Sequence, residues 1–196
     1  MTRHDQARAT RDQLVGIARE LFAEHGYEAT SLDLIQRRAG LSRGALYHHF
    51  PGKRALFAAT LDAVEADVAA TLAKRAGTKG DPLARLRAGS LGWLELAKDP
   101  AIRRIALIDG PSVIGWQEQR AIDQRRTLGM LTTVLDELEA LEGIPEGTAE
   151  VLGHVLFATL NELGLYVANA TDGSSAHTRA VVALDVVLAR LFGAAR

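Results

Sequence analysis

Apolar residues recur at intervals of three and four positions along almost the whole of this 196-residue chain. The first such stripe consists of Leu14, Ile17, Ala18, Leu21 and Phe22, and His25 continues the same spacing. This spacing places side chains on one face of an α-helix, whereas a half-buried strand requires alternation with a period of two, which no segment shows. The sequence therefore predicts an all-α protein.

Glycine, proline and capping residues divide this pattern into separate helices. We expect the first helix to end at Gly26, because glycine readily adopts the positive φ found at helix ends. Thr30, with Asp33 three residues later, should cap a second helix that ends at Gly40. Ser42 should cap a third over residues 43–49, which Pro51 stops. Further helices are expected over residues 53–75, 82–99, 101–108, 112–141, 146–170 and 175–194.

Two short helices joined by a three-residue turn form a helix-turn-helix unit over residues 31–50. Residues 1–54 contain nine basic and six acidic residues, whereas the rest of the chain contains 14 and 18. The near-neutral total of −1 thus combines a basic N-terminal segment with an acidic remainder. This division predicts two domains, residues 1–54 and 55–196, and a polyanionic partner for the first.

The third helix offers an apolar face for packing and an opposite face of small and polar residues. Arg43 is able to hydrogen-bond guanine edges, and the small Gly44 and Ala45 permit close approach to the floor of a groove. Lys53 and Arg54 open the next helix, where the helix dipole disfavours cations. A bound phosphate would offset that cost, although an exposed, screened pair would also be tolerated.

The segment formed by residues 26–54 resembles the DNA-binding domain of the tetracycline-repressor (TetR) family of bacterial regulators. The matching residues are Gly26-Tyr27, Thr30-Ser31, residues 38–42, residues 44–50, Lys53 and Leu56. One departure is Gln36, where the family usually has a small apolar residue. The resemblance implies that Thr30, Tyr47, His48 and Lys53 contact phosphates, that Ser42, Arg43, Gly44 and Ala45 lie near base edges, and that residues 55–196 form an effector-binding and dimerisation domain.

Residues 146–170 are apolar on nearly every side, so that helix needs burial on two faces. The helix over residues 175–194 carries a second wide apolar stripe. Two such helices from each of two chains would form a four-helix interface, which predicts a homodimer through both segments. A two-fold dimer would read double-stranded DNA at a palindromic operator, with half-sites roughly 34–36 Å or a multiple apart.

Residues 105–116 interrupt the helical pattern and include a run, from Asp109 to Trp116, that resembles one subgroup of TetR-like regulators. The family houses its pocket in this region. We expect a largely apolar small-molecule effector, with an apolar lining from Phe57, Leu61, Trp93, Trp116 and Met130, and with polar groups from Asp109, Asn161, Glu162 and Tyr166.

Catalytic signatures are missing from the sequence. The chain has no cysteine, no HExxH motif, no evident Ser/His/Asp arrangement and no glycine-rich phosphate loop. We therefore expect no catalytic residues, metal or cofactor. No signal peptide or membrane span is evident, so a cytoplasmic location is expected. The predicted function is a DNA-binding regulator, most often a repressor in this family. The alternatives are a helical small-molecule-binding protein without DNA-binding activity and, less favoured, a small all-α enzyme.

Overall fold

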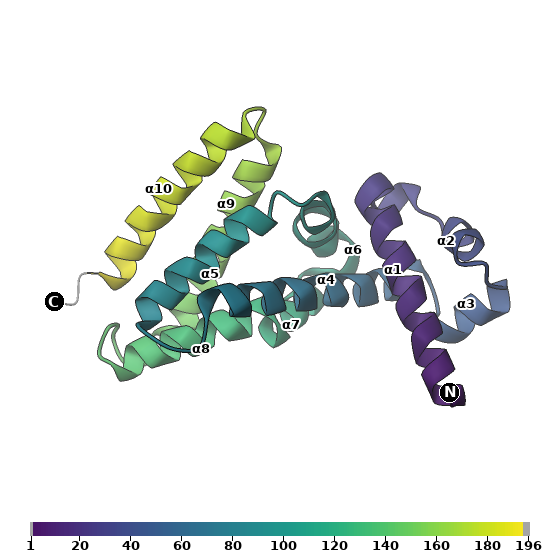
Figure 1. Cartoon of the computed structure of the whole chain (residues 1–196), viewed down its shortest axis with the longest axis horizontal. Coiled ribbons are helices and arrows are strands. Elements are labelled where there is room, and N and C mark those ends of the chain that lie inside the picture. Colours follow the sequence, from purple (N-terminus) through teal and green to yellow (C-terminus); the bar gives the residue numbers. More distant parts are fainter. Residues whose placement is uncertain (1, 194–196) are drawn as a thin grey trace. The chain divides into compact units, whose positions relative to one another are not determined.

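A computed structural model describes residues 2–193, and within this range it contains helices and no strand. The predicted all-α class is therefore confirmed. In chain order the elements, labelled in Figure 1, are α1 (Arg3–Ala29), α2 (Leu32–Ala39), α3 (Arg43–His49), α4 (Lys53–Ala76), α5 (Pro82–Leu96), η1 (Ile102–Asp109), α6 (Gly110–Ile114), α7 (Trp116–Arg125), α8 (Thr127–Ala140), α9 (Ala149–Asn169) and α10 (Gly173–Phe192).

The helices form two compact units that are not contiguous in sequence. The first unit combines the residues up to Val64 with Pro100–Gln119, and the second combines Glu65–Asp99 with the residues from Arg120 onward. Helix α4 supplies residues to both units. The functional division at residue 54 stays a prediction, whereas the structural division adds Pro100–Gln119, from the middle of the chain, to the N-terminal unit.

The helix-turn-helix has the expected helices, and hydrogen bonds hold its turn on both sides. The Ser42 hydroxyl accepts from the Ala45 N–H at 3.2 Å and so caps α3. Gly40, at φ 66°, ends α2, and the next N–H, that of Leu41, donates to the Gln36 carbonyl at 3.3 Å. The Gln36 side chain in turn donates to the Leu41 carbonyl at 2.8 Å. The residue that departs from the family pattern therefore stabilises the turn.

At the end of the first helix, the expected break at Gly26 is present as a kink, and the expected cap of the second helix was wrong. Helix α1 kinks at Gly26, which has φ 76° and ψ 172°, and then continues for one turn to Ala29. The cap of α2 is Ser31 and not Thr30, because the Ser31 hydroxyl accepts from the Leu34 N–H at 3.1 Å. Thr30 is fully buried instead, with its hydroxyl 2.8 Å from the carbonyl oxygen of Gly26.

The single helix expected over residues 112–141 is three helices. Gly115, at φ 80°, separates α6 from α7, and Arg126, at φ −121° and ψ −105°, separates α7 from α8. The expected helix over 101–108 is also wound differently, because η1 is a π-helix. Apolar spacing does not reveal such breaks, since each short helix keeps buried positions at helical intervals.

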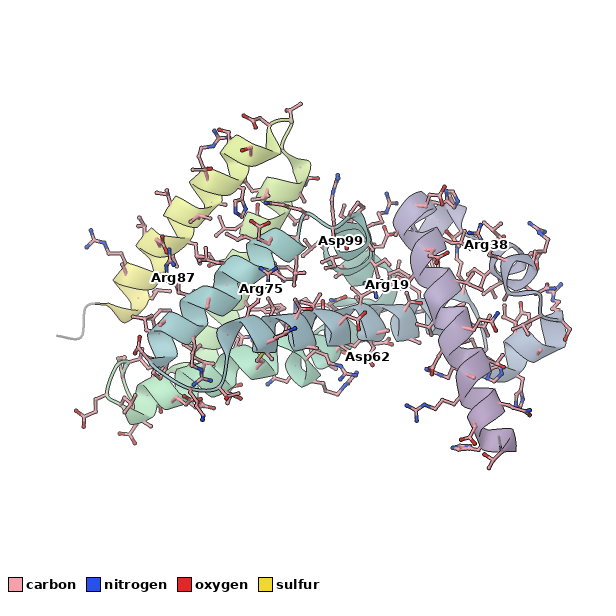
Figure 2. The ribbon with its side chains drawn as sticks, viewed as in Figure 1. Arg19, Arg38, Asp62, Arg75, Arg87 and Asp99 are labelled. Atoms are coloured by element: carbon pink, nitrogen blue, oxygen red, sulfur yellow. The ribbon has the colours of Figure 1, made fainter. Side chains whose placement is uncertain are left out.

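In the second unit α9 packs against α5, α8 and α10, with α9 and α10 lying side by side (Figure 1). The indole N–H of Trp93, on α5, donates to the carbonyl oxygen of Leu160 on α9 at 2.8 Å. Arg87, also on α5 (Figure 2), forms two hydrogen bonds of 2.7 and 2.9 Å with Asp185 on α10. Further ion pairs join His177 of α10 to Glu95 of α5 and Arg85 of α5 to Glu137 of α8.

Helix α9 is long and apolar enough to cross a membrane, the single such helix among the residues that the structure describes. Length and composition alone are weak evidence, because the core helix of a soluble protein passes the same test. Its contacts with three neighbouring helices account for part of its apolar surface.

Candidate functional site

The outward face of α3 carries the side chains that the sequence predicted to contact DNA. Ser42, Arg43, Gly44, Tyr47 and His48 are exposed and Ala45 is half-buried. The opposite face is anchored in the first unit by the buried Leu46 and by Phe50 just beyond the helix. The seven-residue helix therefore presents most of its polar side chains to solvent.

Within that face, the Arg43 guanidinium carbon lies 5.5 Å from the centroid of the Tyr47 ring. Positions four residues apart lie one above the other on a helix, and a guanidinium over an aromatic ring is attracted to it. The contact holds the Arg43 side chain along the helix surface before any ligand binds, although Tyr47 itself is still 43% exposed. Both side chains are thus available together to one external partner.

Gly44 lies at the middle of this face without an internal packing reason for glycine. A Cβ added at Gly44 would meet no heavy atom within 4 Å, and its φ is not positive. Glycine within a helix lowers stability by up to about 1 kcal/mol relative to alanine, and Gly44 is the second residue of α3. The missing side chain brings the α3 backbone itself to the surface, as close approach to the floor of a groove requires.

The two cations at the start of α4 have partners within the first unit. The Lys53 ammonium donates to the Tyr27 carbonyl at 2.9 Å and to the Glu28 carbonyl at 3.4 Å, at the C-terminal end of α1. Arg54 donates to the Ile114 carbonyl and to the Glu118 carboxylate, both at 2.7 Å. Carbonyls at helix C-termini attract cations, so a bound phosphate is not needed to explain this pair.

Thr30 does not belong to the outward surface. Its side chain is 0% exposed and its hydroxyl contacts the backbone of the α1 kink. We therefore remove it from the predicted phosphate contacts and retain Lys53, whose ammonium has three donors and is half-buried.

The second unit encloses a cavity of about 60 Å³ between its helices. Three residues of the predicted effector site, Trp93, Met130 and Asn161, line it together. The lining also includes Leu72, Leu86, Leu131, Val134, Phe157 and Leu160, which make it mainly apolar. Two polar members of the lining, Glu65 and Thr127, were not predicted from the sequence, and their side-chain oxygens lie 3.1 Å apart.

Glu65 is an unusual residue at this position, because it is only 3% exposed. It falls on the buried stripe of α4, four residues after Leu61 and three before Val68. A carboxylate in an apolar stripe is the signal that would have found it, since Asp and Glu are rarely fully buried without a partner. The structure thus places a buried acid at the wall of the cavity.

The other predicted effector residues do not line this cavity. Asp109 and Trp116 belong to the first unit, where Asp109 is buried and Trp116 is 68% exposed. Phe57 and Leu61 are core residues of that unit, and the Phe57 ring contacts those of Phe22 and Tyr27. A separate, open surface groove contains Glu162 and Tyr166. Across the described residues, no group of three or more His, Cys, Asp or Glu side chains is placed to hold a metal ion.

Comparison with known families decides the assignment. The family model described as "Bacterial regulatory proteins, tetR family" matches residues 14–60, and "Tetracyclin repressor-like, C-terminal domain" matches residues 83–191. The chain belongs to the TetR family. The first match contains the helix-turn-helix, and the second extends over most of the second unit as well as η1 and α6.

Similar proteins agree with this assignment. The HTH-type transcriptional regulator AcrR of Shigella flexneri is 34% identical over 103 residues, which cover 52% of this chain and 48% of AcrR. The transposon Tn10 TetC protein of Escherichia coli is 25% identical over 84% of this chain and 83% of its own. A crystal structure of a TetR-family regulator from Pectobacterium atrosepticum matches both chains over their whole length, with 31% identity and a TM-score of 0.80. The protein is a helix-turn-helix transcriptional regulator.

Proposed function

We propose that this TetR-family protein is a cytoplasmic repressor that binds a palindromic operator as a homodimer and is released by a small-molecule effector. The observation that carries the DNA-binding part is the outward face of α3, where Arg43, Gly44, Tyr47 and His48 are exposed together. The proposed base-edge contacts are Ser42, Arg43, Gly44 and Ala45. The proposed phosphate contacts are Tyr47, His48 and Lys53.

The proposed dimer uses α9 and α10. These helices leave large apolar side chains uncovered: Val151, Val155 and Tyr166 on α9, and Val182 and Val186 on α10. Exposed apolar residues gathered on two neighbouring helices are typical of a protein–protein interface. Two-fold pairing of such a surface is self-complementary, and it would present two α3 helices to the two half-sites of a palindrome.

Operator binding is tested with the double variant Arg43→Ala/Tyr47→Ala, which removes the stacked pair from α3. The operator is first selected from random duplex DNA with the wild-type protein. We expect the double variant to bind the operator far more weakly in fluorescence anisotropy. Removal of the Arg43 charge should also make the slope of log affinity against log salt concentration shallower by up to roughly one unit, whereas the uncharged Tyr47 does not contribute to that slope. Lys74→Ala, which removes an exposed charge from the other end of α4, should bind as the wild type does. Equal affinity of the double variant and the wild type would contradict the proposed site.

The proposed effector site is the cavity lined by Trp93, Met130, Asn161, Glu65 and Thr127. Its volume is well below the roughly 150 Å³ of an apolar cavity that holds benzene, so side chains have to move when an effector enters. Met130 suits such a movement, because methionine is unbranched and flexible. The buried Glu65 carboxylate favours a compact, mostly apolar molecule that offers a hydrogen-bond donor, and it disfavours an anion.

Trp93 provides the measurement for this site, because its buried indole lines the cavity. Trp116→Phe leaves Trp93 as the remaining tryptophan. We expect benzyl alcohol and benzylamine to change the Trp93 fluorescence and raise the melting temperature, and benzoate to do neither. In Glu65→Gln the discrimination against benzoate should shrink. Binding of benzoate as tight as that of benzyl alcohol would contradict the proposed chemistry.

A further inference from the structure

The kink of α1 is held by side chains from two other elements of the first unit. At Gly26 the backbone leaves the helical conformation, and the next N–H, that of Tyr27, lies 2.8 Å from the Asp109 carboxylate at the end of η1. The Tyr27 carbonyl accepts from Lys53 of α4 at 2.9 Å. One peptide segment of α1 is thus fixed at its donor by η1 and at its acceptor by α4.

Asp109 combines this contact with a second one. It is 7% exposed, and the oxygen that accepts from Tyr27 also accepts from the Arg104 Nε at 3.0 Å. The Arg104 guanidinium packs on Gly26 so closely that a Cβ at this glycine would overlap it. A charge-assisted hydrogen bond to a nearly buried carboxylate is stronger than a neutral one. Asp109 and Arg104 together therefore bind the kink from one side, and we name them the η1 latch.

The aromatic neighbourhood of Tyr27 makes the kink rigid. Its ring centroid lies 5.9 Å from that of Phe22 and 5.2 Å from that of Phe57, and the Lys53 ammonium is 4.1 Å from it. Burial raises the pKa of the Tyr27 phenol above its ordinary value, so the ring stays neutral at physiological pH. A displaced Tyr27 would have to break all of these contacts together.

The kink lies immediately before the helix-turn-helix, so the η1 latch acts on the part of the chain that leads into α2 and α3. Tyr27 precedes the first residue of α2, Leu32, by only five positions, so the direction of the backbone at Tyr27 sets where α2 and then α3 begin. Asp109 and Arg104 lie outside the residues 14–60 that match the tetR DNA-binding model. The DNA-binding helices of this chain are thus completed by a segment some 50 residues further along, which is wound as a rare π-helix.

We propose that Asp109 and Arg104 are positioning residues for operator recognition: the η1 latch fixes the α1 kink and thereby the orientation of α2 and α3. The latch touches no DNA itself. Its removal leaves the basic surface in place, so non-specific attraction to phosphates persists, whereas α3 no longer aligns with base edges. This inference rests on the proposed operator binding, and it adds a control point outside the helix-turn-helix.

The test compares four full-length variants without effector: Asp109→Ala, Asp109→Asn, Arg104→Ala and Arg103→Ala. Arg103 is the matched control, because it is a half-buried arginine of η1 next to Arg104. Affinities for the selected operator and for a scrambled duplex are measured by fluorescence anisotropy, alongside melting temperatures. Hydrogen exchange is followed at Tyr27 and in residues 31–50.

We expect Asp109→Ala and Arg104→Ala to weaken operator binding by about tenfold or more, the scale of removing a charge-assisted hydrogen bond, while binding of scrambled DNA changes little. Asp109→Asn keeps an acceptor for the Tyr27 N–H, so its effect should be intermediate. Arg103→Ala should match the wild type. Faster exchange should appear at Tyr27 and in residues 31–50 of the two alanine variants of the latch.

Two results would overturn the proposed role of the η1 latch. One is an Asp109→Ala protein that binds the operator as the wild type does. The other is a weakening that affects operator and scrambled DNA equally and follows the melting temperature, which would assign Asp109 to folding alone. Failure of the proposed function looks different, because the wild type itself would then prefer no duplex. In that case hydrogen exchange tests the η1 latch on its own. Unchanged protection of residues 31–50 in Asp109→Ala would overturn its positioning role, and a selective decrease in protection there would support it.

Discussion

At the scale of single residues, we expect one substitution at Gly44 to change the stability of the fold and the affinity for the operator in opposite directions. Gly44→Ala should raise the free energy of unfolding by about 0.5–1 kcal/mol, because alanine is the better helix former and its Cβ meets no atom of the protein. The same methyl group should lower operator affinity if the α3 backbone approaches the groove closely. Chemical denaturation and anisotropy measure the two effects.

Gly16→Ala is the matched control for this prediction. Gly16 is likewise an exposed helical glycine, on α1, with open space around its Cβ position. It should show the same gain in stability and no change in operator affinity. A Gly44→Ala protein that is more stable and binds the operator as tightly as the wild type would show that nothing approaches this position closely.

The residues of the candidate site differed in how well the sequence predicted them. Ser42, Arg43 and Tyr47 were predicted from the family resemblance, and Gly44 and His48 were also predictable because helical spacing places them opposite the buried Leu46. Thr30 was not, because a threonine next to a helix start has the same sequence signature whether its hydroxyl caps the helix or turns inward to the α1 backbone. Residue type specifies what a side chain is able to bind, and only the surrounding fold specifies which partner it meets.

At the scale of elements, helices that begin or end at a capping side chain, a proline or Gly40 were predicted well. The breaks inside the expected helix over residues 112–141 were not predicted. Helix α5 begins at Pro82 as expected, with Asp81 as its cap, and Gly40 ends α2. The breaks at Gly115 and Arg126 were missed because the apolar spacing continues on both sides of each. The cavity was only partly predictable for a related reason: its wall combines α4, α5, α8 and α9, and periodicity within one helix does not show which helices face each other.

The pair Arg87–Asp185 predicts a pH-dependent contribution to the packing of α5 on α10. The hydrogen bonds from Arg87 hold the pKa of the Asp185 carboxyl below its ordinary value of 3.8. A lowered pKa in the folded state stabilises the protein above pH 3.8, and this contribution disappears as the pH falls through the lowered value. Because both side chains are substantially exposed, Asp185→Asn should cost no more than about 0.2–1 kcal/mol at neutral pH.

Urea denaturation between about pH 2 and pH 7 measures this difference, because that range spans the protonation of the carboxyl. The unfolding free energies of the wild type and Asp185→Asn should converge at the acidic end, provided that both remain folded there. Asp136→Asn, at an exposed position of α8, is the control and should follow the wild type throughout. A constant gap between the wild type and Asp185→Asn at every pH would mean that the ion pair is not its origin.

At the scale of the whole molecule, the last question is whether the uncovered apolar residues of α9 and α10 pair two chains. Val151→Lys/Val155→Lys places two charges among apolar side chains that are 63% and 46% exposed in the single chain, so the fold should tolerate them while a buried dimer interface should not. Light scattering should then give the 21.1 kDa of one chain where the wild type gives twice that mass. Operator affinity should fall with it, because each monomer reads only one half-site. Leu141→Lys, at a position 67% exposed just after α8, is the matched control and should remain dimeric. A double variant that keeps the dimer mass would place the interface on another surface.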